Sequence, residues 1–175
     1  AGANAEQIAR AEEIIAEEAA RFDLWRRNRR RHGRSNPGEP DFPIFVSLHG
    51  ASVLIAGAGK VAARRAEKLL GFGALVHVVS PALAPAMEKL LSRDGLRWTR
   101  EAYRAEHMEG VTLAIAATDR RDVNQALGRD ARERGVLVSV ADKRQECTFY
   151  FPAILKSDFP TAGLVSTTGD HPLVR

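Results

Sequence analysis

The sequence predicts an α/β fold in which helices cover both faces of a doubly wound parallel sheet. Two short apolar runs, 52–56 and 111–118, are typical of strands that are buried on both faces. Segments with the helical spacing of apolar residues lie between such runs. Strand-like and helix-like segments therefore alternate along the chain, and this alternation requires crossover connections between parallel strands.

Each expected element follows from its local sequence. The expected strands are short and apolar, and they cover residues 52–56, 75–80, 96–102, 111–118 and 136–142. The expected helices between them cover residues 61–73, 81–95 and 119–135, the first closing on glycines and the second starting at a proline. After residue 147 the alternation stops. Two strand-like runs, Thr148–Leu155 and Thr161–Thr168, predict a C-terminal β-hairpin.

The N-terminal part differs in character from the rest. Residues 5–31 predict an amphipathic helix, because Ile8, Ile15, Phe22 and other apolar residues recur at spacings of three and four. A segment rich in glycine and proline follows and predicts a linker. We therefore expect three parts: a helix and basic linker at 1–40, a nucleotide-binding domain at 41–147, and the hairpin region at 148–175.

Composition limits the possible classes of protein. The 175 residues carry a formal charge of +4, and no apolar run approaches the roughly 20 residues that a membrane-spanning helix needs. Cys147 is the one cysteine of the sequence, which excludes an intramolecular disulfide framework and a cysteine-rich zinc site. The first residues lack the pattern of a secretory signal, so we expect a cytoplasmic protein. No histidine spacing indicates a metal site.

Arginines gather between Arg26 and Arg34. Two interpretations stay open: a solvated helix end whose cations suit the helix dipole, or a surface that holds phosphates or anionic lipid. Aromatic residues that would stack bases do not alternate with these arginines. Nucleic-acid binding is therefore not expected.

The clearest motif is Gly57-Ala58-Gly59-Lys60-Val61-Ala62, a G-x-G-x-x-A sequence. It follows an expected strand and opens an expected helix, which is the context of a dinucleotide-binding loop. Gly57 permits a tight turn, and Gly59 lets the backbone approach a pyrophosphate, which the helix N-terminus attracts. The motif predicts a Rossmann-type domain that binds NAD.

The second expected strand ends at Ser80 and Pro81, where dinucleotide sites usually carry an acidic residue that bonds the adenosine ribose. Ser80 offers one hydrogen bond but no charge. NAD is our hypothesis, and NADP stays open as the alternative.

Polar residues follow the fourth and fifth expected strands. Thr118 and Asp119 come after the fourth strand, where they can face cofactor or substrate or cap the next helix. Asp142 follows the fifth strand, and we expect it to be partly desolvated there. Burial raises the pKa of a carboxyl group and suits it to proton transfer, so Asp142 is a candidate general base. Cys147 is interpreted as a small buried residue rather than a nucleophile.

Several ordered motifs from Phe42 to Arg175 resemble one family. They are FPIFVSLHGASVLIAGAGKVAARRAEKLL, LAIAATDRRDVNQAL, VSVADKRQECTFYFPAIL and STTGDHPLVR. Together they resemble the N-terminal, NAD-binding module of siroheme synthases, the precorrin-2 dehydrogenase family. Ser139 departs from the asparagine that is common in the family, and Thr168, Asp170 and His171 replace small residues in its tail.

The resemblance implies oxidation of precorrin-2 to sirohydrochlorin with NAD, in siroheme or cobalamin biosynthesis. Asp142 matches the family's proposed general base. The cofactor-binding positions that the motif and the resemblance indicate are Gly57, Gly59, Lys60, Val61, Ser80, Pro81, Ala82, Thr118 and Asp119. In the tail we expect Ser166, Thr167 and His171 to bind the tetrapyrrole substrate. The family also implies a homodimer whose dimerisation region begins at the hairpin, and in some members insertion of ferrous iron.

A second function class remains open, a non-catalytic module that binds a nucleotide or a tetrapyrrole. Residues 11–25, within the expected N-terminal helix, are similar to part of the connecting helix of glutamyl-tRNA reductase, another enzyme of tetrapyrrole synthesis. This similarity fits a fusion between enzymes of one pathway.

Overall fold

The computed structural model describes residues 42–156 and 161–164. The expected N-terminal helix, the arginine cluster and the boundary at residue 40 lie outside the described residues. They stay predictions. So does the end of the tail from residue 165 onward.

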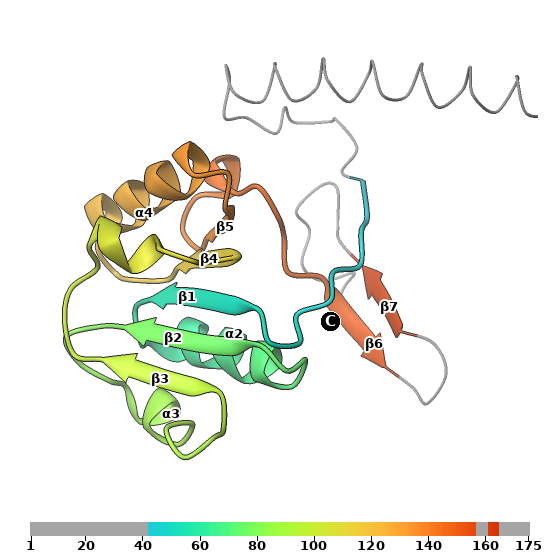
Figure 1. Ribbon diagram of the computed structural model, residues 1–175, viewed down its shortest axis with the longest axis horizontal. Coiled ribbons are helices and arrows are strands. Elements are labelled where there is room, and N and C mark those ends of the chain that lie inside the picture. The colour runs from blue at the N-terminus through green and yellow to red at the C-terminus, as the bar shows by residue number, and fades with distance from the viewer. Residues whose placement is uncertain (1–41, 157–160, 165–175) are drawn as a thin grey trace, which may run out of the picture. The chain divides into compact units, whose positions relative to one another are not determined.

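The described chain builds a five-stranded parallel sheet with the order β3-β2-β1-β4-β5 (Figure 1). Its strands are β1 (Ser52–Ala56), β2 (Leu75–Val79), β3 (Leu96–Thr99), β4 (Leu113–Ala116) and β5 (Leu137–Val140). The strand order reverses between β1 and β4, as expected of a doubly wound sheet. The predicted α/β fold of the Rossmann type is therefore confirmed.

Alternating side chains of the strands form two hydrophobic layers. Val53 and Ile55 of β1 pack with buried alanines of helix α2 (Lys60–Leu70). Leu54 and Ala56 point to the other side and pack with Leu127 of helix α4 (Arg121–Glu133). Because every second residue of a strand faces the same side, the continuous apolar runs of the sequence supply both layers at once.

Several expected elements are shorter than the sequence predicted. The helix expected at 81–95 is only α3 (Pro85–Glu88), because the N–H of Ala84 bonds to Ala58 and the residues after 88 form tight turns that bond three residues back. The third strand ends at Thr99 instead of residue 102, because the chain turns there and the N–H of Glu101 donates to the carbonyl oxygen of Thr99. The fourth strand covers four residues instead of eight.

The hairpin is present but begins later than expected. Its strands are β6 (Ala153–Lys156) and β7 (Thr161–Leu164), which pair antiparallel. Thr148 does not belong to the hairpin. Its N–H and side-chain hydroxyl bond to the backbone of Val138, so the chain from Cys147 first runs back along β5.

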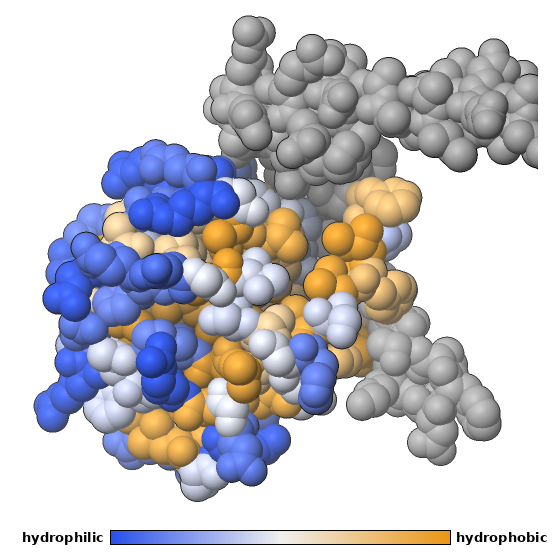
Figure 2. Space-filling model, in the orientation of Figure 1, coloured by the Kyte–Doolittle hydropathy of each residue, from blue (hydrophilic) through white to orange (hydrophobic). Residues whose placement is uncertain are grey.

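Polar and apolar side chains gather in different places on the surface. Figure 2 shows hydrophilic side chains on the left, where the arrows of β1, β2 and β3 point in Figure 1. Large apolar residues of the segment before β1 are strongly exposed, among them Phe42, Ile44 and Phe45. The end of the sheet that is expected to bind ligands is thus polar, whereas the segment before β1 exposes apolar surface.

A polar cluster that involves His77 stabilises the edge of the sheet near β3. Arg97 donates a hydrogen bond to Nδ1 of His77 at 3.0 Å, so Nε2 carries the hydrogen and donates to the Thr99 hydroxyl at 2.7 Å. Burial, then the charge of Arg97, then His107 lower the pKa of His77, while Glu101 raises it to a smaller extent. The folded state therefore holds this histidine neutral.

Acidification is expected to destabilise the protein through His77. A histidine with a lowered pKa in the folded state contributes stability above its unfolded pKa of about 6.5, and this contribution is lost as the pH falls toward the folded value. Urea unfolding near pH 7.5 and again near pH 5.5 should show a larger loss of stability for the wild type than for H77Q. Equal losses in the two proteins would contradict this assignment.

Candidate functional site at the carboxyl edge of the sheet

The loop after β1 makes a bend that only glycine can occupy at its first position. Gly57 has a φ of +101°, and its N–H donates to the carbonyl oxygen of Val79 at 2.9 Å. A Cβ atom on Gly57 would lie 2.3 Å from the carbonyl oxygen of Ala117, which is far inside van der Waals contact. The expectation that Gly57 permits a tight turn is confirmed, and the reason is the close approach of the chain that follows β4.

The second glycine of the motif faces open space. No atom lies within 4 Å of the position that a Cβ on Gly59 would take. Gly59 is the N-cap of α2, no side chain caps this helix, and its first turn carries no acidic residue. The first N–H groups of α2 therefore remain available to an anion. Lys60 and Val61 are exposed beside them. This bend fits the pyrophosphate of a dinucleotide.

The loop after β2 is held by its own hydrogen bonds. The buried Ser80 hydroxyl donates to the carbonyl oxygen of Ala82 at 2.8 Å, so it is not free to donate to a ribose as the sequence suggested. Trp98 and Arg100 donate to the carbonyl oxygens of Ser80 and Pro81. Pro81 and Ala82 are exposed. The exposed residues Pro81 and Ala82, rather than the side chain of Ser80, are what this loop presents to a ligand.

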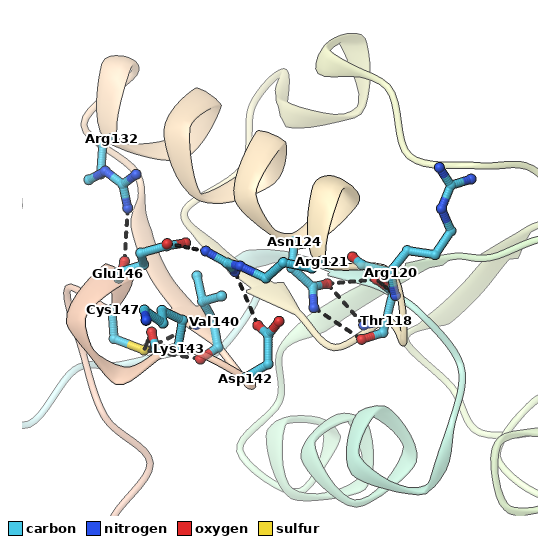
Figure 3. A network of polar contacts seen from close by, with 10 residues as sticks. All are labelled: Thr118, Arg120, Arg121, Asn124, Arg132, Val140, Asp142, Lys143, Glu146 and Cys147. Atoms are coloured by element: carbon cyan, nitrogen blue, oxygen red, sulfur yellow. Dashed lines mark hydrogen bonds and ion pairs between the residues drawn. The ribbon is translucent and has the colours of Figure 1, made fainter.

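Asn124 organises the loop after β4. Its Oδ1 accepts hydrogen bonds from the N–H and the hydroxyl of Thr118, at 3.1 and 2.7 Å, and its Nδ2 donates to the Thr118 carbonyl oxygen (Figure 3). Asp119 follows in an exposed position. Neither residue is the N-cap of α4, which is Arg120 without a side-chain cap. Thr118 is thereby held in place at the edge of the sheet.

Asp142 lies two residues beyond the end of β5. Its side chain keeps 37% of its surface exposed, so it is partly covered, as expected, but not buried. One carboxylate oxygen, Oδ1, receives a hydrogen bond from Nη1 of Arg121 at 3.3 Å. The same arginine also pairs with Glu146 through Nη2 (Figure 3).

The turn after Asp142 is tied to β5 by Cys147. The Cys147 thiol is buried, accepts a hydrogen bond from the N–H of Val140 at 3.1 Å and lies 3.3 Å from the carbonyl oxygen of the same residue. The interpretation of Cys147 as a small buried residue is confirmed.

Backbone hydrogen bonds join the ends of four strands into one edge. Gly57 bonds to Val79 of β2, Ala117 to Ala56 of β1, and Ala141 to Ala116 of β4. The glycine bend, the Thr118 loop and Asp142 therefore meet at the carboxyl edge, as the motif order predicted. Ser166, Thr167 and His171 lie outside the described residues, and their expected role in substrate binding stays a prediction.

Three polar residues of this edge were not singled out as site residues from the sequence: Asn124, Arg121 and Glu146. Asn124 could have been found, because it lies on the buried face of α4 with Leu127 and Ala131 and needs partners there. Arg121 and Glu146 are 25 residues apart in the sequence, and no local pattern predicts their pairing.

Substitution by alanine should have different effects at Gly59 and at Gly57. G59A fits the backbone, since φ at Gly59 is −78°, and it should leave the stability unchanged. Its methyl group would occupy the space that we assign to the pyrophosphate. We expect the Kd for NAD to rise roughly tenfold or more, a loss of about 1.4 kcal/mol of binding free energy. G57A should instead lower the stability by roughly 2 kcal/mol or more. Calorimetric titration measures the NAD affinity of each variant, and urea unfolding measures its stability. Unchanged NAD affinity in G59A would contradict the placement of the pyrophosphate at Gly59.

Within the described residues, no helix has the length and apolar character to cross a membrane.

Comparisons with known proteins agree with this geometry. The model of the family described as "Putative NAD(P)-binding" matches residues 44–153. A "Probable multifunctional siroheme biosynthesis protein" of Ruminiclostridium josui is 35% identical over 98% of this chain and 35% of its own length. The siroheme synthase of Photorhabdus laumondii is 39% identical over 75% of this chain and 28% of its own length, and that of Nitrosomonas eutropha is 40% identical over 76% and 28%.

This chain thus spans about a third of the length of the curated relatives it matches. Among solved structures, a precorrin-2 dehydrogenase superposes with a TM-score of 0.66 at 23% identity, over 77% of this chain and 66% of that one. This likeness shows a shared fold. NAD, the expected cofactor, agrees with the matched family. The chain belongs to the family described as "Putative NAD(P)-binding", whose model matches more than half of it.

Proposed function

We propose that the protein containing this chain oxidises precorrin-2 to sirohydrochlorin with NAD, in the synthesis of siroheme or cobalamin. One observation carries the proposal: an open glycine bend and the carboxylate of Asp142 share one edge of the sheet. The names of the relatives, siroheme synthase and siroheme biosynthesis protein, support the substrate.

The residues that would hold NAD lie on three neighbouring loops. The amides of the bend at Gly59 and Lys60 suit the pyrophosphate, and the exposed residues Pro81 and Ala82 suit the adenosine. Thr118 and Asp119 lie on the side toward β5. Bound NAD supplies a hydride acceptor, so that removal of a hydride and a proton from precorrin-2 yields sirohydrochlorin, NADH and a proton.

Asp142 is the group that we assign as general base. Its Oδ1 is paired with Arg121, and no hydrogen bond to its Oδ2 is present among the described residues. A carboxylate oxygen without a partner at an exposed edge is available to take a proton from a bound substrate.

The substrate, partner and location follow as parts of the same proposal. Precorrin-2 carries many carboxylates, which suits a basic protein, and Ser166, Thr167 and His171 are proposed to contact it. A homodimer would cover the exposed apolar residues Phe42, Ile44 and Phe45. A sequence with one cysteine, buried and unpaired, fits a reducing cytoplasm.

The alternative is a binding module without catalysis. The multifunctional relative matches along 98% of this chain, which fits a domain inside a larger protein of the same pathway. Binding of NAD and tetrapyrrole without formation of NADH would favour this alternative.

Replacement of Asp142 tests the catalytic assignment. D142N should bind NAD with wild-type affinity, because Asp142 is not assigned to the pyrophosphate or the adenosine, while kcat for NADH formation falls roughly 10²- to 10⁴-fold. The absorbance of NADH measures turnover with precorrin-2. D94N is the matched control, since Asp94 is exposed at the opposite edge of the sheet, just before β3. Wild-type turnover in D142N would remove Asp142 from the mechanism.

A further inference from the structure

Arg121 lies between two carboxylates of the turn after β5. It is the first residue of α4, and its guanidinium reaches Asp142 through Nη1 and Glu146 through Nη2 (Figure 3). The neighbouring Arg120 points elsewhere and pairs with Asp122. The two arginines are adjacent in sequence, yet only one of them contacts the proposed base.

Glu146 anchors this guanidinium. The Glu146 side chain is the more buried of the two carboxylates, with 19% of its surface exposed against 37% for Asp142. Its second oxygen, Oε2, is buried without a hydrogen-bond partner, so Arg121 is the cation that directly compensates its charge. A carboxylate that is mostly covered and has one buried oxygen holds its counter-ion more firmly than an exposed carboxylate does.

The packing of α4 against the turn brings these groups together. Arg132 donates a hydrogen bond to the carbonyl oxygen of Glu146 at 2.9 Å. A Cβ atom on Gly128 would lie 3.2 Å from Val140 and 3.7 Å from Oε2 of Glu146. The glycine thus lets the helix approach β5 closely. The turn that carries Glu146, the partner of Nη2 of Arg121, is therefore held by α4 and not by Asp142.

We infer that Arg121 is a positioning residue, which holds the Asp142 carboxylate in the direction needed for proton transfer. A guanidinium fixed by Glu146 engages Oδ1 and leaves Oδ2 to the substrate. Without it, an exposed aspartate samples several rotamers, and only one of them points its free oxygen at the substrate. This inference rests on the proposed function, because it acts through Asp142.

A double-mutant cycle on kcat tests the inference in the complete protein. R121M should lower kcat roughly 10- to 100-fold, with KM for precorrin-2 and the affinity for NAD within about twofold of wild type. In a D142N background the same substitution should cost almost nothing more, since there is no base left to position. R120M is the matched control and should retain wild-type kcat.

Other results of the cycle distinguish failure of the positioning role from failure of the base assignment. Additive losses in the cycle, or a raised KM with unchanged kcat, would overturn the positioning role and leave the base assignment intact. Full activity in D142N would overturn the base assignment, and the positioning role with it. R121M leaves Glu146 without its cation and can destabilise the fold. The cycle is therefore repeated with R121K, which keeps the charge, and the same coupling to Asp142 is required there. Urea unfolding midpoints check the stability of each variant.

Discussion

The absence of space between Gly57 and Ala117 is the constraint on which the rest of the structure depends. The turn after β1 must pass so close to the chain leaving β4 that not even a methyl group fits between them. This close approach brings the loops of adjacent strands to one edge at the point where the strand order reverses. The bend leads into α2, whose N-cap Gly59 leaves the first N–H groups without a side-chain cap. The anion binding that we propose there would therefore depend on how β1 and β4 are packed.

The two sides of this edge differ in how their polar groups are satisfied. On the side of β2, the Ser80 hydroxyl donates within its own loop, so this loop presents the exposed residues Pro81 and Ala82 instead. On the side of β5, Arg121 and Glu146 form a pair that is fixed by helix packing, and Asp142 is its exposed end. The first arrangement suits binding with little demand on side chains. The second suits a reaction, because a carboxylate keeps one oxygen free in a defined direction.

Local patterns were sufficient to predict the sheet, the glycine bend and the location of Asp142. Each depends on neighbours in sequence: an apolar run, two glycines after a strand, an acid after a strand. The length of α3 could not be predicted, because Ala84 bonds to Ala58, which belongs to the glycine loop. The pairing of Asp142 with Arg121 and the pairing of Arg121 with Glu146 were missed for the same reason. They depend on how closely α4 approaches β5 at Gly128, a tertiary distance that no periodicity encodes.

The most direct measurement is a crystal structure of the complete protein with NAD bound. The pyrophosphate should lie on the N–H groups that follow Gly59. The nicotinamide ring should lie on the side of the bend that faces Asp142, with Oδ2 of that residue directed toward the ring and Oδ1 still paired with Arg121. A bend that stays empty at saturating NAD, or a carboxylate at position 142 that points away from the ring, would contradict the proposed site.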